Sequence, residues 1–185
     1  MAGDTQDEVI RKPGDSHPDI DSMIRVDQAG EYGATRIYAG QLAILGDRSP
    51  AARSIARMAV QEERHRERFD QIISERGVRP TLLQPFWDKA GFALGAVTAL
   101  IGPEAAMACT AAVETEIDKH YSDQLDALGA DDPELSETIA QFREEEREHH
   151  DTAIAEGAES APAYPLLSGA IRLACKAAIA ASKRF

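Results

Sequence analysis

The sequence has few aromatic residues, fewer basic than acidic residues and no long hydrophobic run. Only 5% of its 185 residues are aromatic, and the Val, Ile and Thr alternation typical of strands is scarce, which disfavours a sheet. The formal net charge of -12 disfavours a nucleic-acid partner. The longest uncharged apolar run, AGFALGAVTALIGP at 90–103, is too short for a membrane-spanning helix. A hydrophobic fraction of 43%, rich in Ala, instead predicts one all-α domain with a core.

Cysteine is scarce, and the N-terminal segment lacks the features of a targeting sequence. Cys109 and Cys175 both lie in Ala-rich apolar surroundings, so we expect buried free thiols in a reducing compartment, with a disulfide as the alternative. The first residues carry many acids and no apolar stretch, so we expect neither a secretory signal nor a transit peptide. We expect a flexible tail at 1–18, followed by a single domain at 19–185.

Capping signals divide the sequence into six predicted helices. Ser49 followed by Pro50 is typical of a helix start, and Gly46, Gly77 and Gly129 stand where helices are expected to end. Two polar helices precede an apolar one, and this order occurs twice. The predicted helices cover 21–45, 50–76, 86–101 and 104–128, then one from the DDPELSE segment to 156 and one from the APAYP segment to 183.

The two halves share a spacing of glutamate, histidine and tyrosine. In each half a glutamate precedes a Glu-x-x-His motif by 31 or 32 residues, and a tyrosine follows that first glutamate by seven. We therefore infer an internal duplication, with repeats at about 21–102 and about 104–184. The matched pairs are Glu31 with Glu114, Glu62 with Glu146, His65 with His149, and Tyr38 with Tyr121.

The repeated glutamates and histidines predict a site for two metal ions. A Glu and a His three residues apart share one helix face, and a further Glu from each of two other helices completes the donor set of ferritin-like dimetal bundles. Four carboxylates balance two divalent cations, and imidazole with carboxylate suits iron or manganese. We favour two iron ions because iron is redox-active, bridged by Glu62, Glu146 or both. The predicted ligands are Glu31, Glu62, His65, Glu114, Glu146 and His149.

The charged faces that carry these motifs offer alternative donors. A single Glu-x-x-His in such a helix is usually solvated, but its duplication argues against that interpretation. On the fifth helix, the i,i+4 pairs Glu145 with His149 and Glu146 with His150 are also compatible with one face, and the repeat register selects Glu146 with His149. The remaining competitors are Glu63, which lies only two residues before His65, and Glu116, which would break the match of Glu114 to Tyr121.

Four further side chains lie near the predicted metal site in the sequence. Tyr38 and Tyr121 could relay electrons or bond an oxygen species, although packing with a satisfied hydroxyl is the commoner role of a buried Tyr. We expect His120 to be exposed, with a place next to the metal ligands as the alternative. Asp118 could orient a ligand histidine from another helix.

Two predicted helices are too apolar for a simple bundle, and we expect both to associate with a membrane. No acidic residue follows Ser160, and a basic stripe on the last helix suits anionic lipid headgroups. Small residues on the other apolar helix permit close helix approach. Core or oligomer packing is the alternative, but membrane or partner contact is preferred. The stripe is Arg172, Lys176 and Lys183, and the small residues are Gly91, Gly95 and Ala99.

Four features resemble one enzyme family. IRVDQAGEYGATRIYAGQ at 24–41, the paired Glu-x-x-His motifs, GFALGAVTALIGPEAAMACTAAVE at 91–114, and EHHDTA followed by APAY are similar to the demethoxyubiquinone hydroxylase family of ubiquinone biosynthesis. The resemblance covers roughly 22–185. It implies a ferritin-like di-iron monooxygenase that hydroxylates the ring of demethoxyubiquinol, a 2-polyprenyl-3-methyl-6-methoxy-benzoquinol, with dioxygen. Carried over by position, the family's iron ligands fall on the six residues given above.

The resemblance also implies partners and a location. Expected partners are the polyprenylated quinol, dioxygen, NADH or another reductant, a membrane surface, and a homo-oligomer or a complex of ubiquinone-biosynthesis enzymes. Family members are peripheral membrane proteins, and eukaryotic ones work with a lipid-binding accessory protein. Without a transit peptide, we expect the cytoplasmic side of a bacterial inner membrane. The rival interpretations are a ferritin-like iron-storage or ferroxidase protein and a manganese catalase.

Overall fold

The chain folds into α-helices, as the sequence predicts. The computed structural model describes residues 18–47 and 49–185, so the flexible tail expected at 1–18 lies outside it up to residue 17. Within these residues there is no strand. The elements are α1 (Ile20–Leu45), α2 (Pro50–Arg76), α3 (Gln84–Ile101), α4 (Pro103–Leu128), α5 (Pro133–Ala155), a 3-10 turn (Ala158–Ser160) and α6 (Tyr164–Ser182).

Local capping explains most helix ends. The Ser49 side chain accepts a hydrogen bond from the backbone N–H of Ala52, at 3.0 Å, and Pro50 begins α2. Gly77 ends that helix in a left-handed conformation, with φ 66°. The predicted starts of α3 and α4 are wrong by one or two residues, because a proline stands inside the first turn of each helix instead of interrupting the chain before it.

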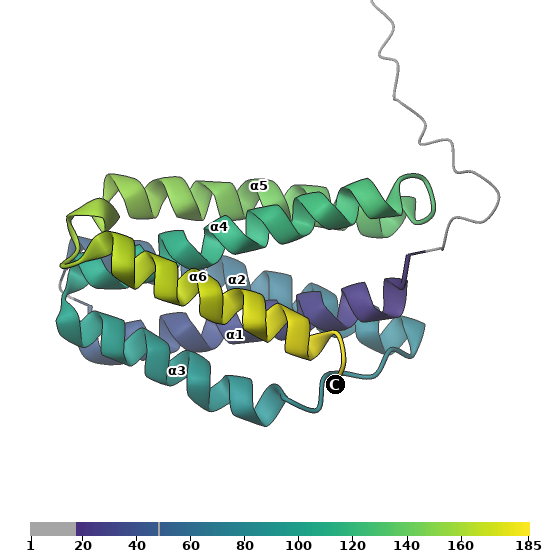
Figure 1. Ribbon diagram of the computed structural model, residues 1–185, viewed down its shortest axis with the longest axis horizontal. Helices are drawn as coiled ribbons and strands as arrows, with labels where there is room; N and C mark the ends of the chain where they lie inside the picture. The colour runs from purple at the N-terminus through teal and green to yellow at the C-terminus, as the bar shows by residue number, and fades with distance from the viewer. Residues whose placement is uncertain (1–17, 48) are drawn as a thin grey trace, which may run out of the picture.

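Four long helices form a bundle, and two shorter helices cover one side of it (Figure 1). α1 packs against α2, and α4 packs against α5. α3 lies on α1 and also contacts α4, while α6 lies on α4 and also contacts α1. α3 and α6 therefore cover the α1 and α4 side of the bundle, away from α2 and α5.

The small residues of α3 serve packing inside the protein. A side chain at Gly95 would place its Cβ 1.9 Å from the carbonyl oxygen of Ile37, and one at Gly40 would lie 2.1 Å from that of Phe92. α1 and α3 thus touch backbone to backbone. The sequence favoured a membrane or partner contact for these small residues. That preference is wrong, because α1 packs against them.

The outward faces of α3 and α6 remain apolar. Phe86 and Leu100 of α3 and Leu166 and Leu173 of α6 are all more than half exposed. Among the described helices, only α6 is long and apolar enough to cross a membrane by length and composition, and 11% of that stretch is buried. The sequence predicted no helix able to span a membrane and two helices that associate with one. By length and composition α6 could span a membrane, whereas α3 does not pass the same test.

Candidate metal centre

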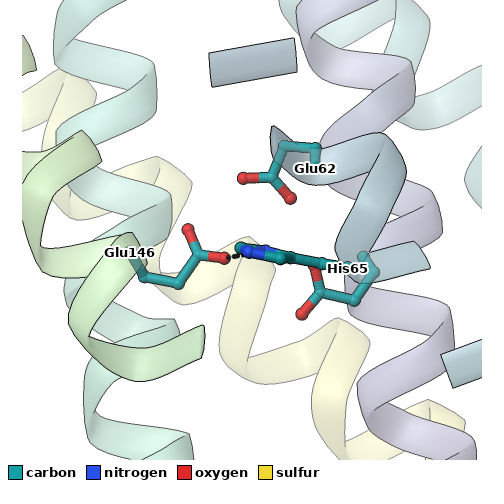
Figure 2. Close-up of side chains that lie close together, drawn as sticks. Glu62, His65 and Glu146 are labelled. Atoms are coloured by element: carbon teal, nitrogen blue, oxygen red, sulfur yellow. Dashed lines mark hydrogen bonds and ion pairs between the residues drawn. The ribbon is translucent and has the colours of Figure 1, made fainter. Parts of the chain in front are cut away.

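Six buried side chains from four helices meet inside the bundle. Each is at most 3% exposed. Figure 2 shows Glu62 and His65 of α2 facing Glu146 of α5 across the interior. The six are Glu31 on α1, Glu62 and His65 on α2, Glu114 on α4, and Glu146 and His149 on α5, which is the set predicted from the sequence.

The six residues form two overlapping groups of four potential metal donors. In each group, one donor atom from every residue lies within 4.8 Å of the others. Glu62 and Glu146 belong to both groups, and a histidine Nδ1 faces the centre of each. His65 Nδ1 is 3.0 Å from Glu146 Oε1, and His149 Nδ1 is 3.0 Å from Glu146 Oε2. The groups are Glu31, Glu62, His65 and Glu146, and then Glu62, Glu114, Glu146 and His149.

Burial and mutual repulsion disfavour negative charge on the carboxylates of the cluster. Burial, together with the charge of Glu146, raises the pKa of both Glu62 and Glu114 well above the ordinary range. Burial also acts to raise the pKa of Glu146, but hydrogen bonds from His149 and His65 lower it to about 2. Burial acts to lower the pKa of His65, but its hydrogen bond to Glu146 raises it to about 12. Protonated imidazoles or bound cations can supply the charge that these carboxylates need.

Each of the two histidines bonds, through its outer ring nitrogen, a residue that the sequence did not predict as its partner; Glu145 was considered only with His149. His65 Nε2–H donates to Glu145 Oε2 at 3.0 Å, and His149 Nε2–H donates to Gln61 Oε1 at 3.1 Å. Such partners fix the ring so that its other nitrogen faces a metal. A sequence signal existed, because Glu145 and Gln61 both directly precede the glutamate of a Glu-x-x-His motif.

The two tyrosines bond across the halves of the chain. Tyr38 of α1 donates to Glu114 of α4 at 3.0 Å, and Tyr121 of α4 donates to Glu31 of α1. Burial, with the nearby carboxylates, raises the pKa of both phenols well above the usual range. Both hydroxyls are therefore satisfied and protonated, which agrees with the packing role.

Two of the competing donors face outward from the cluster. Glu63 pairs with Arg66 at the surface, at 2.6 Å. His150 pairs with its neighbour Asp151, at 3.1 Å. The register of the repeats therefore selected the donors that the fold brings together.

Glu116 is buried, but it serves to attach α6. Its Oε1 lies 2.6 Å from Arg172 Nε and 3.7 Å from Lys176 Nζ. The expectation that these two cations face lipid headgroups stays a prediction, because Arg172 and Lys176 remain 44% and 56% exposed while they pair with this buried carboxylate.

Two expectations about neighbouring polar residues are wrong. His120 is buried, and it lies 3.2 Å from Asp27 Oδ1, to which Gln124 also donates at 2.8 Å. Asp118 accepts from Arg143 at 2.8 Å and bonds no histidine of the cluster. Spacing along α4 indicated which turn these residues occupy, but not which helix stands opposite them.

An apolar pocket of about 170 Å³ lies beside the cluster, between α1, α3, α4 and α6. A narrow gap joins its wall to the cluster, because Ala34, Ile37 and Val113 line both spaces. Cys109 is buried, while Cys175 is half-buried and lines the pocket; both are free thiols. The full lining of the gap is Ala34, Ile37, Tyr38, Thr110, Val113 and Glu114.

Known proteins with the same sequence features fall in one family. The family model "Ubiquinone biosynthesis protein COQ7" matches residues 18–182. A 3-demethoxyubiquinol 3-hydroxylase of Rhodospirillum rubrum is 56% identical over 94% of this chain and 83% of its own. A mouse mitochondrial NADPH-dependent 3-demethoxyubiquinone 3-hydroxylase is 53% identical over 90% of this chain and 78% of its own. A yeast mitochondrial 5-demethoxyubiquinone hydroxylase is 44% identical over 89% and 78%. The chain belongs to the ubiquinone biosynthesis protein COQ7 family.

Proposed function

We propose that this protein is a di-iron monooxygenase that hydroxylates the ring of demethoxyubiquinol with dioxygen. The observation that carries the proposal is the pair of four-donor groups that share Glu62 and Glu146, set beside an apolar pocket. The names of the relatives, which are hydroxylases of demethoxyubiquinol or demethoxyubiquinone, support this substrate.

The donors fit two divalent metal ions. Neither carboxylate oxygen of Glu62 accepts a hydrogen bond, although the side chain is 1% exposed. Its close polar contact is with His149 Nδ1, 3.0 Å from Glu62 Oε1. A buried carboxylate that accepts no hydrogen bond is costly, and a metal ion shared with Glu146 would satisfy it. Carboxylate and imidazole donors with no thiolate suit iron. Two bound irons would supply the reduction of dioxygen that the hydroxylation needs.

The pocket and the gap give the substrate a place beside the cluster. We infer that the quinol ring occupies the pocket of about 170 Å³, whose lining is mostly aliphatic. The polyprenyl tail would leave between α3 and α6, whose outward faces are apolar. Ile37 and Val113 separate the pocket from Tyr38 and Glu114, so a small rotation of these side chains would admit the ring edge.

We infer peripheral attachment to the cytoplasmic side of a bacterial inner membrane, through α3 and α6. The exposed apolar residues belong to α3 and α6, the two helices that also line the pocket, which supports a lipid surface there. A nicotinamide nucleotide is the reductant we favour, because the mouse relative is named as NADPH-dependent. We also infer that the bundle is ferritin-like and arose by duplication, which the reciprocal Tyr38 and Tyr121 bonds support.

Lipid analysis of a cell that lacks this protein tests the function. Demethoxyubiquinone should accumulate, and the normal quinone should return with the intact chain but not with Glu62→Ala. Normal quinone content in the deleted cell, or full rescue by Glu62→Ala, would contradict the proposal.

A further inference from the structure

One buried hydroxyl near the cluster has no hydrogen-bond partner. Thr110 lies on α4, four residues before Glu114, and it is 1% exposed. Its Oγ1 makes no hydrogen bond within the described residues. Buried polar groups are nearly always paired, and an unpaired one is costly to the folded state. The lack of a partner for the Thr110 hydroxyl therefore needs an explanation.

Other helical hydroxyls in this chain solve the same problem locally. Thr98 donates to Leu94 O at 2.9 Å, and Thr115 donates to Ala111 O at 2.7 Å. Both use the carbonyl one turn earlier, which is the usual bond for a helical threonine. The corresponding carbonyl for Thr110 is Ala106 O, which instead accepts from Gln41 Nε2 at 3.0 Å.

The unpaired hydroxyl lines the gap between the apolar pocket and the cluster. The other polar side chains of that gap, Tyr38 and Glu114, bond each other at 3.0 Å. The gap has no volume for a water molecule, so solvent does not satisfy Thr110 there. Thr110 is thus the polar side chain of this gap with a free donor, and an apolar pocket lies on the gap's other side.

We propose that the Thr110 hydroxyl donates a hydrogen bond to a ring oxygen of the quinol substrate. This role rests on the proposed function. The hydrocarbon tail has no acceptor, whereas the ring carries hydroxyl and methoxy oxygens, so the bond selects the head group. It forms when the ring edge displaces Ile37 and Val113 and enters the gap beside Glu114. The bond then fixes which ring carbon faces the metal cluster.

The test compares three variants in the full-length, iron-loaded protein. Thr110→Val removes the hydroxyl at constant shape, Thr110→Ser retains it, and Thr115→Val makes the same change where the hydroxyl is already bonded to the helix. The probe is a short-chain methoxy-benzoquinone. Its binding is followed by quenching of Trp87, the single tryptophan, which lines the pocket. Hydroxylated product formed per reductant consumed is measured in the same samples.

Loss of one neutral hydrogen bond should weaken binding of the probe about 2- to 12-fold in Thr110→Val. Product per reductant should fall, and the melting temperature should hold or rise, because an unpaired hydroxyl is removed. Thr110→Ser and Thr115→Val should bind and couple like the unchanged protein. Unchanged binding and coupling in Thr110→Val, or a melting temperature lower by several degrees, would overturn the role and leave the function intact. An unchanged protein that holds iron but hydroxylates nothing would overturn both.

Discussion

At the scale of single residues, the six donors are not equivalent. Glu62 and Glu146 belong to both groups, whereas Glu31 and Glu114 each belong to one. His65 is held from behind by a carboxylate and His149 by an amide. Two ions bound here would therefore differ in the basicity of their imidazole ligands.

Removal of a shared donor should cost more metal than removal of an unshared one. We predict that Glu62→Ala binds almost no iron, because both groups lose a ligand, and that Glu31→Ala keeps about one ion per chain. Metal analysis after reconstitution with ferrous iron measures this, with circular dichroism as the control for folding. Two ions per chain in Glu62→Ala would contradict the bridging role.

The Glu145 carboxylate, which bonds His65, should strengthen iron binding by the donor group that contains His65. Glu145→Gln makes the partner of His65 chemically like Gln61, and we predict that one of the two iron affinities falls by about tenfold. Competition with a coloured chelator measures both affinities. Glu144→Gln is the control, because Glu144 is exposed and pairs with Arg147. Equal losses in the two variants would argue against a specific effect on His65.

The predicted ligands came from spacing, and their neighbours did not. A Glu and a His three residues apart must share a helix face. The register of Glu62 with Glu146 and of His65 with His149 was therefore sufficient to predict which side chains meet. His120 and Asp118 depend on what stands opposite α4. Asp27 lies 93 residues before His120 in the chain, so no local pattern indicated this contact.

At the scale of helices, the contact between α1 and α3 fixes one wall of the pocket. Gly91 and Leu94 of α3 and Gly33 and Ile37 of α1 line it, and these helices touch at Gly40 and Gly95. The sequence indicated close approach of α3 to some helix, but a stripe of small residues does not specify its partner.

A methyl group at this contact should separate the helices. We predict that Gly95→Ala lowers the free energy of unfolding by about 1–3 kcal/mol or more, because its Cβ would lie 1.9 Å from a backbone oxygen. Gly169→Ala in α6 has nothing within 4 Å, and it should raise that energy by about 0.5–1 kcal/mol. Urea denaturation measures both. Equal stability of the two variants would contradict the close packing of α1 and α3.

At the scale of the whole molecule, the acidic bundle and the apolar helices that cover it, α3 and α6, occupy separate parts of the structure. The acids of the cluster lie inside the bundle, while exposed apolar residues gather on the outward faces of α3 and α6. Arg172 and Lys176 are turned to Glu116. Attachment to lipid would then combine apolar contact with the exposed parts of these cations and of Lys183.

Charge on the outer face of α6 should release the protein from lipid. Leu166 is 76% and Leu173 is 70% exposed, and each leucine buried in lipid is worth about 1.5–3 kcal/mol, so Leu166→Asp with Leu173→Asp should weaken vesicle binding at least about tenfold. Val60→Asp on α2 is the control, since Val60 is 65% exposed away from this side. Flotation with vesicles measures binding. Equal flotation of all variants would contradict attachment through α6.

The measurement that tests the account most directly uses isotope-labelled dioxygen. The iron-loaded protein is supplied with demethoxyubiquinol, a reductant and ¹⁸O₂, and the product is analysed by mass spectrometry. We predict one labelled oxygen atom in a new ring hydroxyl. If iron-loaded protein forms no hydroxylated quinol, or if the oxygen of the new hydroxyl comes from water, the proposed monooxygenase reaction is contradicted.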